Sequence, residues 1–163
     1  MTILTQDILK SLLSYDPDTG IFTWLVRRGS RGAIGAQITR LTKSGYVYVG
    51  IDKRAYLAHR LAWLYVYGVW PDGGIDHINQ NRVDNRIANL RLANKSENGQ
   101  NRAAPKHNKS GVKGVYWSHR ENKWVAAIRA DKQCLRLGAF TNLADAARVR
   151  AEAELKYHPY RPR

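Results

Sequence analysis

Residues 74–101 read GIDHINQNRVDNRIANLRLANKSENGQN, a segment unusually rich in asparagine. Two short apolar runs within it, residues 75–78 and 90–93, predict strands. The asparagines crowd the stretch between these runs, and asparagine favours turns and caps because its side chain bonds to nearby backbone groups. We therefore expect a long loop between two strands, followed by a helix from about residue 95 to residue 102. This is a β–β–α unit.

Four polar residues of this unit carry the chemistry. Asp76 and His77 end the first predicted strand, Asn89 precedes the second strand, and Asn98 lies on the helix. A β–β–α unit brings its helix against its first strand, so Asp76 and Asn98 can converge. Both present oxygen ligands, which suit Mg²⁺, whereas zinc prefers sulfur or imidazole. The sequence therefore predicts a site for Mg²⁺, or for another divalent cation such as Mn²⁺, held by these two residues.

His77 follows Asp76 directly, so on a strand the two side chains point to opposite faces. His77 can then face a water molecule while Asp76 faces the metal. A neutral imidazole with a pKa near 6.5 is a competent general base at neutral pH. From the residues alone an alternative stays open, because an Asp-His pair also occurs by chance in surface loops without a role.

The motifs DH, DNR, NL and SEN follow one another in this order, and the similarity continues upstream through HRLAWLYVYGVWP. Over about residues 55–102 the chain resembles the HNH endonucleases of the His-Me finger superfamily, in the branch found in phage and intron homing enzymes. The resemblance implies that His77 is the general base and that Asp76 and Asn98 ligate the metal. It also implies that Asn89 braces the loop and orients the base. Many HNH enzymes have histidine where this chain has Asn98, and asparagine is a known variant.

The charge of the chain points to a polyanionic partner. In 163 residues there are 27 Lys and Arg against 13 Asp and Glu, a net charge of +14. Nucleic acid is the first candidate partner, an anionic membrane surface is the second, and solubility alone is the third explanation. The chain has no run of 18 apolar residues, and its start, MTILTQDILK, does not resemble a signal peptide, so we expect a cytoplasmic protein without a membrane span. The single cysteine, Cys134, excludes an internal disulfide framework and a multi-cysteine zinc site.

Residues 108–163 are the most basic part, with twelve Lys and Arg against five Asp and Glu. Strands are predicted at 112–118, 123–130 and 134–140, and Asn142 precedes a predicted helix. The pattern GV, KW-A-I, LG-F and D-AA resembles the plant ethylene-response-factor, or Apetala-type, DNA-binding domain. In that family a three-stranded sheet lies in the major groove of DNA. The resemblance implies that the DNA-contacting residues here are Lys113, Tyr116, Trp117, Arg120, Lys123, Trp124, Arg129 and Arg136.

The first third of the chain is expected to support the core. The apolar residues within 5–14 have helical spacing, which predicts a helix there with Thr5 as the N-cap. Strands are predicted at 21–26 and 45–52. Residues 55–67 are almost wholly apolar, which predicts a buried helix ended by Gly68, on which His59 has a packing role. A basic loop between the strands adds backbone contacts to DNA, through Arg27, Arg28, Arg31 and Arg40.

These observations predict an α+β protein with a ββα-metal nuclease core and an appended three-stranded sheet with a helix. The expected domains are a support region at 1–54, the nuclease core at 55–104 and the DNA-binding domain at 108–163. The predicted function is a metal-dependent, homing-type DNA endonuclease of phage origin, acting on double-stranded DNA. A monomer would nick one strand and a homodimer could cut both. Two alternatives remain: a non-catalytic DNA-binding regulator on an HNH scaffold, and an RNA-binding protein.

Overall fold

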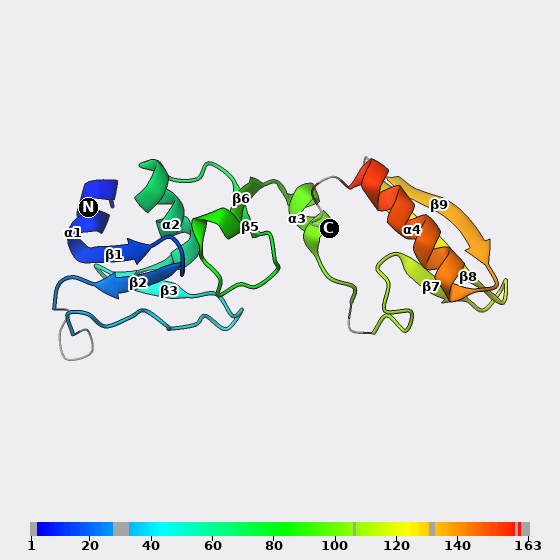
Figure 1. Ribbon diagram of the computed structural model, residues 1–163, viewed down its shortest axis with the longest axis horizontal. Helices are drawn as coiled ribbons and strands as arrows, with labels where there is room; N and C mark the ends of the chain where they lie inside the picture. Colours follow the sequence, from blue (N-terminus) through cyan, green and yellow to red (C-terminus); the bar gives the residue numbers. More distant parts are fainter. Residues whose placement is uncertain (1–2, 28–32, 106, 131–132, 159, 161–163) are drawn as a thin grey trace. The chain divides into compact units, whose positions relative to one another are not determined.

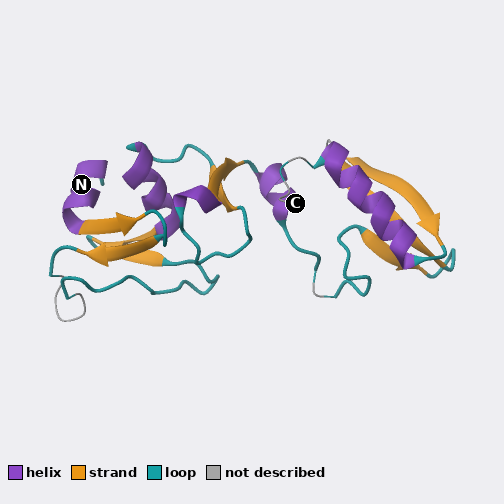
Figure 2. Ribbon diagram, in the orientation of Figure 1, coloured by secondary structure: helices purple, strands orange, loops and turns teal. Residues whose placement is uncertain are grey.

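The computed structural model describes residues 3–27, 33–105, 107–130, 133–158 and 160. The chain forms two compact units, Met1–Lys95 and Ser96–Arg163, and each is described by itself (Figure 1). Both contain helices and small antiparallel sheets (Figure 2), which confirms the predicted α+β class. Among the described residues no helix is long and apolar enough to cross a membrane.

Among its described residues, the first unit contains three two-stranded antiparallel sheets, two α-helices and one short 3-10 helix. In chain order its elements are α1 (Gln6–Leu12), β1 (Leu13–Asp16), β2 (Ile21–Trp24), β3 (Tyr48–Ile51), β4 (Arg54–Leu57), α2 (Ala58–Tyr67), β5 (Gly74–His77), the short 3-10 helix η2 (Ile87–Asn89) and β6 (Leu90–Ala93). Strand β1 pairs with β2, β3 with β4 and β5 with β6, all antiparallel. The predicted strands around residues 75–78 and 90–93 are therefore confirmed as β5 and β6.

The start of α1 and the end of α2 lie at the predicted capping residues. The Thr5 side chain accepts a hydrogen bond from the backbone N–H of Ile8 at the start of α1. Gly68 ends α2 in the left-handed conformation, with φ at 75°, which glycine adopts without steric cost. The prediction was wrong for residues 55–57, which belong to strand β4 rather than to the first turn of the helix. Asp52 and Lys53 both have positive φ and make a two-residue turn that pairs β4 with β3, and the apolar run that follows this turn concealed the strand.

One hydrophobic core unites the first unit. Its fully buried side chains come from α1, β2, β3 and α2, and include Leu9, Phe22, Val49, Leu61 and Leu64. Ile75 and Leu90, from the predicted nuclease core, belong to the same cluster. The expected boundary after residue 54 is therefore not seen, because both sides of it share this core.

The second unit is a three-stranded sheet with a helix on one face, preceded by a short helix. Its elements are α3 (Lys95–Asn101), which begins at the unit boundary, β7 (Val115–Ser118), β8 (Lys123–Ala130), β9 (Gln133–Phe140) and α4 (Leu143–Tyr157). The strands are antiparallel in the order β7-β8-β9. Asn142 caps α4 as predicted, since its side chain accepts from the backbone N–H of Ala144 at 2.8 Å. Val115, Ala126 and Ala146 form the centre of a separate small core between sheet and helix.

The β1–β2 hairpin supports the loop between β5 and β6 through two close contacts. The buried hydroxyl of Tyr15 donates to the backbone carbonyl of Asn85 at 2.7 Å. Gly20, with φ at 73°, lies so close to the same loop that an added Cβ would meet the nitrogen of Arg86 at 2.3 Å. Backbone atoms occupy this space, so a side chain at residue 20 has to displace the loop.

We predict that Gly20→Ala destabilises the protein by about 2–3 kcal/mol more than Gly35→Ala does. Both glycines have positive φ, so both substitutions strain the backbone, but nothing lies within 4 Å of a Cβ at Gly35. Denaturant unfolding of the two variants beside the wild type measures the difference. Equal losses would mean that the close approach at Gly20 is unimportant.

Candidate active site

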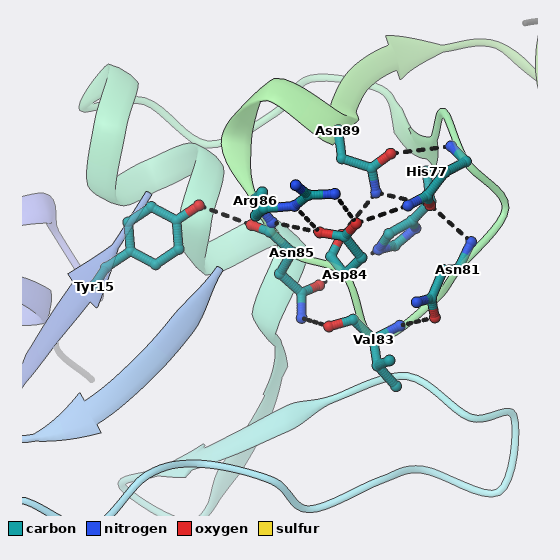
Figure 3. Close-up of polar contacts among 9 residues, drawn as sticks. Tyr15, His77, Asn81, Val83, Asp84, Asn85, Arg86 and Asn89 are labelled. Atoms are coloured by element: carbon teal, nitrogen blue, oxygen red, sulfur yellow. Dashed lines mark hydrogen bonds and ion pairs between the residues drawn. The ribbon is translucent and has the colours of Figure 1, made fainter. Parts of the chain in front are cut away.

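The long loop between β5 and β6 is ordered by its own asparagine and aspartate side chains (Figure 3). The Asn79 side chain accepts from the backbone N–H of Asn81 at 2.9 Å and donates to the Asp84 carboxylate at 2.7 Å. The Asn81 side chain accepts in turn from the N–H of Val83 at 3.2 Å. These bonds replace the strand pairing that the loop lacks, so a segment without regular structure holds a defined shape.

The Asn89 side chain, at the C-terminal end of this loop, bonds to residues earlier in the loop. Its side-chain oxygen accepts from the backbone N–H of Asn79 at 3.0 Å. Its side-chain nitrogen donates to the Asn79 side-chain oxygen at 3.0 Å and to the Asp84 carbonyl at 2.8 Å. Every hydrogen-bonding atom of this buried carboxamide is thus used within the loop, and Asn89 braces the segment that follows His77.

His77 ends β5 and is only 5% exposed. Its Nε2 lies 3.4 Å from the side-chain oxygen of Asn85, which is itself 2% exposed. The side-chain nitrogen of Asn85 donates to the carbonyl of Val83 at 3.1 Å, which fixes the orientation of the amide. Since an amide oxygen only accepts, the neutral imidazole carries its proton on Nε2, and Nδ1 is the nitrogen that can receive one.

Asn85 is a residue of the candidate site that the sequence analysis did not single out. The motif DNR contains it, but nothing in the motif shows that its carboxamide faces the base rather than solvent. Burial lowers the pKa of His77 below 6.5, and the hydrogen bond to Asn85 and the charge of Asp76 oppose that shift only in part. His77 is therefore uncharged at neutral pH, as a general base has to be.

Two aromatic rings enclose His77 on its inner side. The ring of His59, from α2, stands edge-on to the His77 ring with centroids 5.1 Å apart, and the ring of Tyr46 lies 5.3 Å from His59 and 5.9 Å from His77. His59 is 6% exposed, and its Nδ1 has no hydrogen-bond partner among the described residues. Burial lowers the pKa of His59 to about 3. The packing role expected for His59 holds, but nothing in the sequence indicates that it packs on His77.

Asp76 pairs with an arginine across the hairpin. It stands opposite Arg91 in the β5–β6 register, is 5% exposed, and one of its oxygens accepts from Arg91 Nη2 at 2.8 Å and Nε at 3.1 Å. Because Asp76 and His77 are neighbours on a strand, their side chains leave opposite faces. Asn98 lies on α3 in the second unit, so the predicted pairing of Asp76 with Asn98 around one metal ion stays a prediction. The oxygen chemistry of the two side chains fits a hard divalent cation.

In the second unit, the residues predicted to contact DNA fall into three groups. Trp117 and Trp124 stand opposite each other, with centroids 5.2 Å apart, and Trp124 packs against the core beneath α4. Strand alternation then places Tyr116, Lys123 and Arg129, all exposed, on the face opposite to α4, where Val125 is buried. The remaining cations are placed separately, and this third group comprises Arg120, exposed in the turn after β7, Arg136, paired with Glu121 at 2.5 Å, and Lys113.

Lys113 was predicted to contact DNA, but its side chain binds the C-terminal end of α3 within the second unit. Its ammonium group donates to the carbonyls of Gly99, Gln100 and Arg102, at 2.6, 3.1 and 3.0 Å. A lysine at the C-terminal end of a helix satisfies carbonyls that have no partner within the helix. Among the loop arginines of the first unit, Arg27 and Arg40 are exposed, whereas Arg28 and Arg31 lie outside the described residues.

Comparison with known proteins gives the class of this site. Residues 56–100 match the family model described as HNH endonuclease, a range that contains Asp76, His77, Asn89 and Asn98. The chain therefore carries an HNH endonuclease domain there, and this domain indicates a nuclease. The match does not reach residues 108–163, whose resemblance to the ethylene-response-factor domain has no support from the comparisons.

Over 74 residues the chain is 39% identical to Protein 3.8 of Escherichia phage T7. The match covers 45% of this chain and 61% of that relative, so the chain spans less than two thirds of the length of the curated protein that it matches. No solved structure matches the chain at a significant level.

The burial of His59 predicts a loss of stability in acid. His59 stays neutral in the folded protein down to about pH 3, whereas in the unfolded chain it takes up a proton below about pH 6.5. The unfolded state thus binds more protons between these values, and the free energy of unfolding falls as the pH falls through that window. From pH 7 to pH 5 this single group removes about 2 kcal/mol.

His59→Phe keeps an aromatic ring but has no titrating group. We predict that its free energy of unfolding falls by about 2 kcal/mol less than that of the wild type between pH 7 and pH 5. Urea unfolding of both proteins at the two pH values gives the comparison. Only the difference between pH values is used, so a change in packing caused by the substitution cancels. The same pH dependence in both proteins would contradict a neutral, buried His59.

Proposed function

We propose that this protein is a metal-dependent DNA endonuclease that hydrolyses phosphodiester bonds with His77 as general base. The observation that carries the proposal is the hydrogen-bonded position of His77, buried at the end of β5 with Nε2 against Asn85, in the segment that matches the HNH endonucleases. HNH nucleases generally use divalent metals and act on nucleic acid. Double-stranded DNA is the proposed substrate, and the cytoplasm of a bacterial host is the proposed location, since the relative is a phage protein.

We propose the following roles for the residues of the site. Asn85 holds the proton of His77 on Nε2, so that Nδ1 accepts a proton from the attacking water. Asn89 keeps the loop after His77 in place, which fixes where the imidazole points. Asp76 and Asn98 are the residues that would hold Mg²⁺ or Mn²⁺. A cation bound there would polarise the phosphodiester group and stabilise the leaving oxygen.

The proposal is tested by incubating the protein with supercoiled plasmid and Mg²⁺ or Mn²⁺, with EDTA in place of the metal as the control. The wild type is expected to cut only with the metal, and His77→Ala is expected to bind DNA almost normally but to cut on the order of 10²–10⁴ times more slowly. A nick leaves open circles, whereas a double-strand break leaves linear DNA, so the same gel shows which product forms.

The outcomes separate the proposal from its alternative. DNA binding by the wild type without cleavage in either metal would favour a non-catalytic DNA-binding regulator. Wild-type cleavage rates in His77→Ala would remove His77 from the reaction.

We propose further that the face of the second unit's sheet opposite to α4 binds the DNA backbone through its exposed cations. Lys123 and Arg129 are exposed there, on the face opposite to the one covered by α4, and neither makes an ion pair among the described residues. Each cation that neutralises a phosphate releases counterions, so binding that uses these residues weakens as the salt concentration rises. The net charge of +14 supports this use of the surface.

We predict that the double variant Lys123→Gln/Arg129→Gln binds duplex DNA more weakly and lowers the slope of log affinity against log salt by about 0.9 for each phosphate that is no longer neutralised. The matched control, Arg148→Gln/Lys156→Gln, removes the same charge from exposed positions on α4. Fluorescence anisotropy across a salt series measures both. Equal changes of affinity and salt slope in the two double variants would mean that the net charge of the protein sets the affinity, and not the sheet face that carries Lys123 and Arg129.

A further inference from the structure

Arg82 is an exposed residue of the loop between β5 and β6, yet its side chain is held by two contacts. Its Nη1 donates to the backbone carbonyl of Ser44 at 2.7 Å. Its guanidinium carbon stands 5.0 Å from the centre of the Tyr46 ring, an arrangement that attracts a cation to the face of the ring. An arginine that was merely solvated would have neither constraint.

The position of Tyr46 connects this guanidinium to His77. The Tyr46 ring contacts Arg82 and also lies 5.9 Å from the ring of His77, between centroids. The positive charge is therefore placed one aromatic ring away from the proposed general base. Because Arg82 is exposed, its guanidinium lies on the solvent side, from which DNA has to approach.

Arg82 differs from the neighbouring arginines in its charge balance. Arg86 is paired with Asp84, with Nη2 2.6 Å from the carboxylate, and Arg91 is paired with Asp76 at 2.8 Å. Among the residues that the structure describes, Arg82 has no carboxylate partner, and its one hydrogen bond leaves several of its five N–H groups for a ligand. A guanidinium fixed in place without an anion matches the planar fork that binds phosphate oxygens.

We propose that Arg82 binds a phosphate of the cleaved DNA strand, next to the phosphate that is cut. Arg82 and His77 both lie next to the Tyr46 ring, which puts the guanidinium near enough to the proposed general base to hold the phosphate beside the one that reacts. By anchoring this phosphate, Arg82 positions the scissile bond in front of His77. The anchoring by Ser44 and Tyr46 before DNA arrives reduces the entropy lost on binding. This inference rests on the proposed endonuclease function.

The test is a double-mutant cycle that combines a substitution of Arg82 with the removal of single phosphate charges from the DNA. It uses a duplex whose cleavage site has been mapped. Phosphates flanking the cut are replaced one at a time by neutral methylphosphonates, and single-turnover cleavage with Mg²⁺ is measured for wild type and Arg82→Gln. We expect one flanking position at which the replacement slows the wild type on the order of tenfold or more. Arg82→Gln should be slowed to a similar degree on unmodified DNA and should show no further loss at that position.

Two variants define what the arginine contributes. Arg82→Lys keeps the charge but loses the planar fork, so it should recover part of the rate. The matched control is Lys10→Gln, because Lys10 is also an exposed cation over a tyrosine ring, 5.3 Å from the centre of Tyr65, and carries the same charge. This control should keep the full response of the wild type to every methylphosphonate.

The possible results are distinct. Arg82→Gln cleaving at the wild-type rate, or responding to each methylphosphonate as the wild type does, would overturn the proposal for Arg82. If the wild type cuts no DNA with Mg²⁺ or Mn²⁺, the endonuclease function fails instead. The same cycle is then measured with DNA-binding affinity as the readout. If the effect of Arg82→Gln on affinity is the same at every methylphosphonate position as on unmodified DNA, the role of Arg82 is overturned as well.

Discussion

The carboxamides of Asn85 and Asn89 hold the loop between β5 and β6, and the arrangement of the site depends on them. Asn89 bonds to the backbone of Asn79 and Asp84 within the loop, and Asn85 joins the loop to His77. Both side chains are almost fully buried, so each unpaired atom would cost free energy. Loop shape and imidazole orientation therefore have one common origin, the pairing of buried amides within a segment that has little regular structure.

The rest of the first unit supports this loop from outside. The hydroxyl of Tyr15 and the bare Cα of Gly20 meet its backbone, and His59 packs on His77 from α2. These residues come from segments far apart in the chain and share one hydrophobic core. Residues 3–27 are thus part of the framework of the candidate active site, which explains why they cannot be separated from it as an independent domain.

The sequence predicted those features that local chemistry controls. Asparagines marked the loop, Gly68 marked the end of α2, and Asn142 marked the start of α4. It did not predict contacts that depend on tertiary packing, such as Asn85 with His77 or Arg82 with Tyr46, because each joins residues whose local pattern is that of an ordinary loop. Strand β4 was missed for a different reason, since an almost wholly apolar stretch carries no period that distinguishes a helix from a strand.

In the second unit the predicted strands and helix were found, but their surfaces were assigned less well. Two of the residues expected to face DNA, Trp117 and Trp124, lie on the face that α4 covers, because strand register and alternation place them there. The sequence pattern predicted the order of the elements correctly, whereas the resemblance to the ethylene-response-factor domain, which the comparisons do not support, was no guide to individual side chains. Tyr116, Arg120, Lys123 and Arg129 are among the predicted positions that are exposed, and their contact with DNA stays a prediction.

The three carbonyls held by Lys113 bear on how such a protein can be assembled from parts. Helix α3 ends the sequence motif of the nuclease, yet its last turn is completed by a residue beyond the linker. A short helix containing Gly99 has little stability of its own. Recombination that exchanged the C-terminal segment for another would conserve the motif in full and still deprive its helix of this cap. A viable exchange has to be made upstream of α3, or the incoming segment has to bring an equivalent lysine.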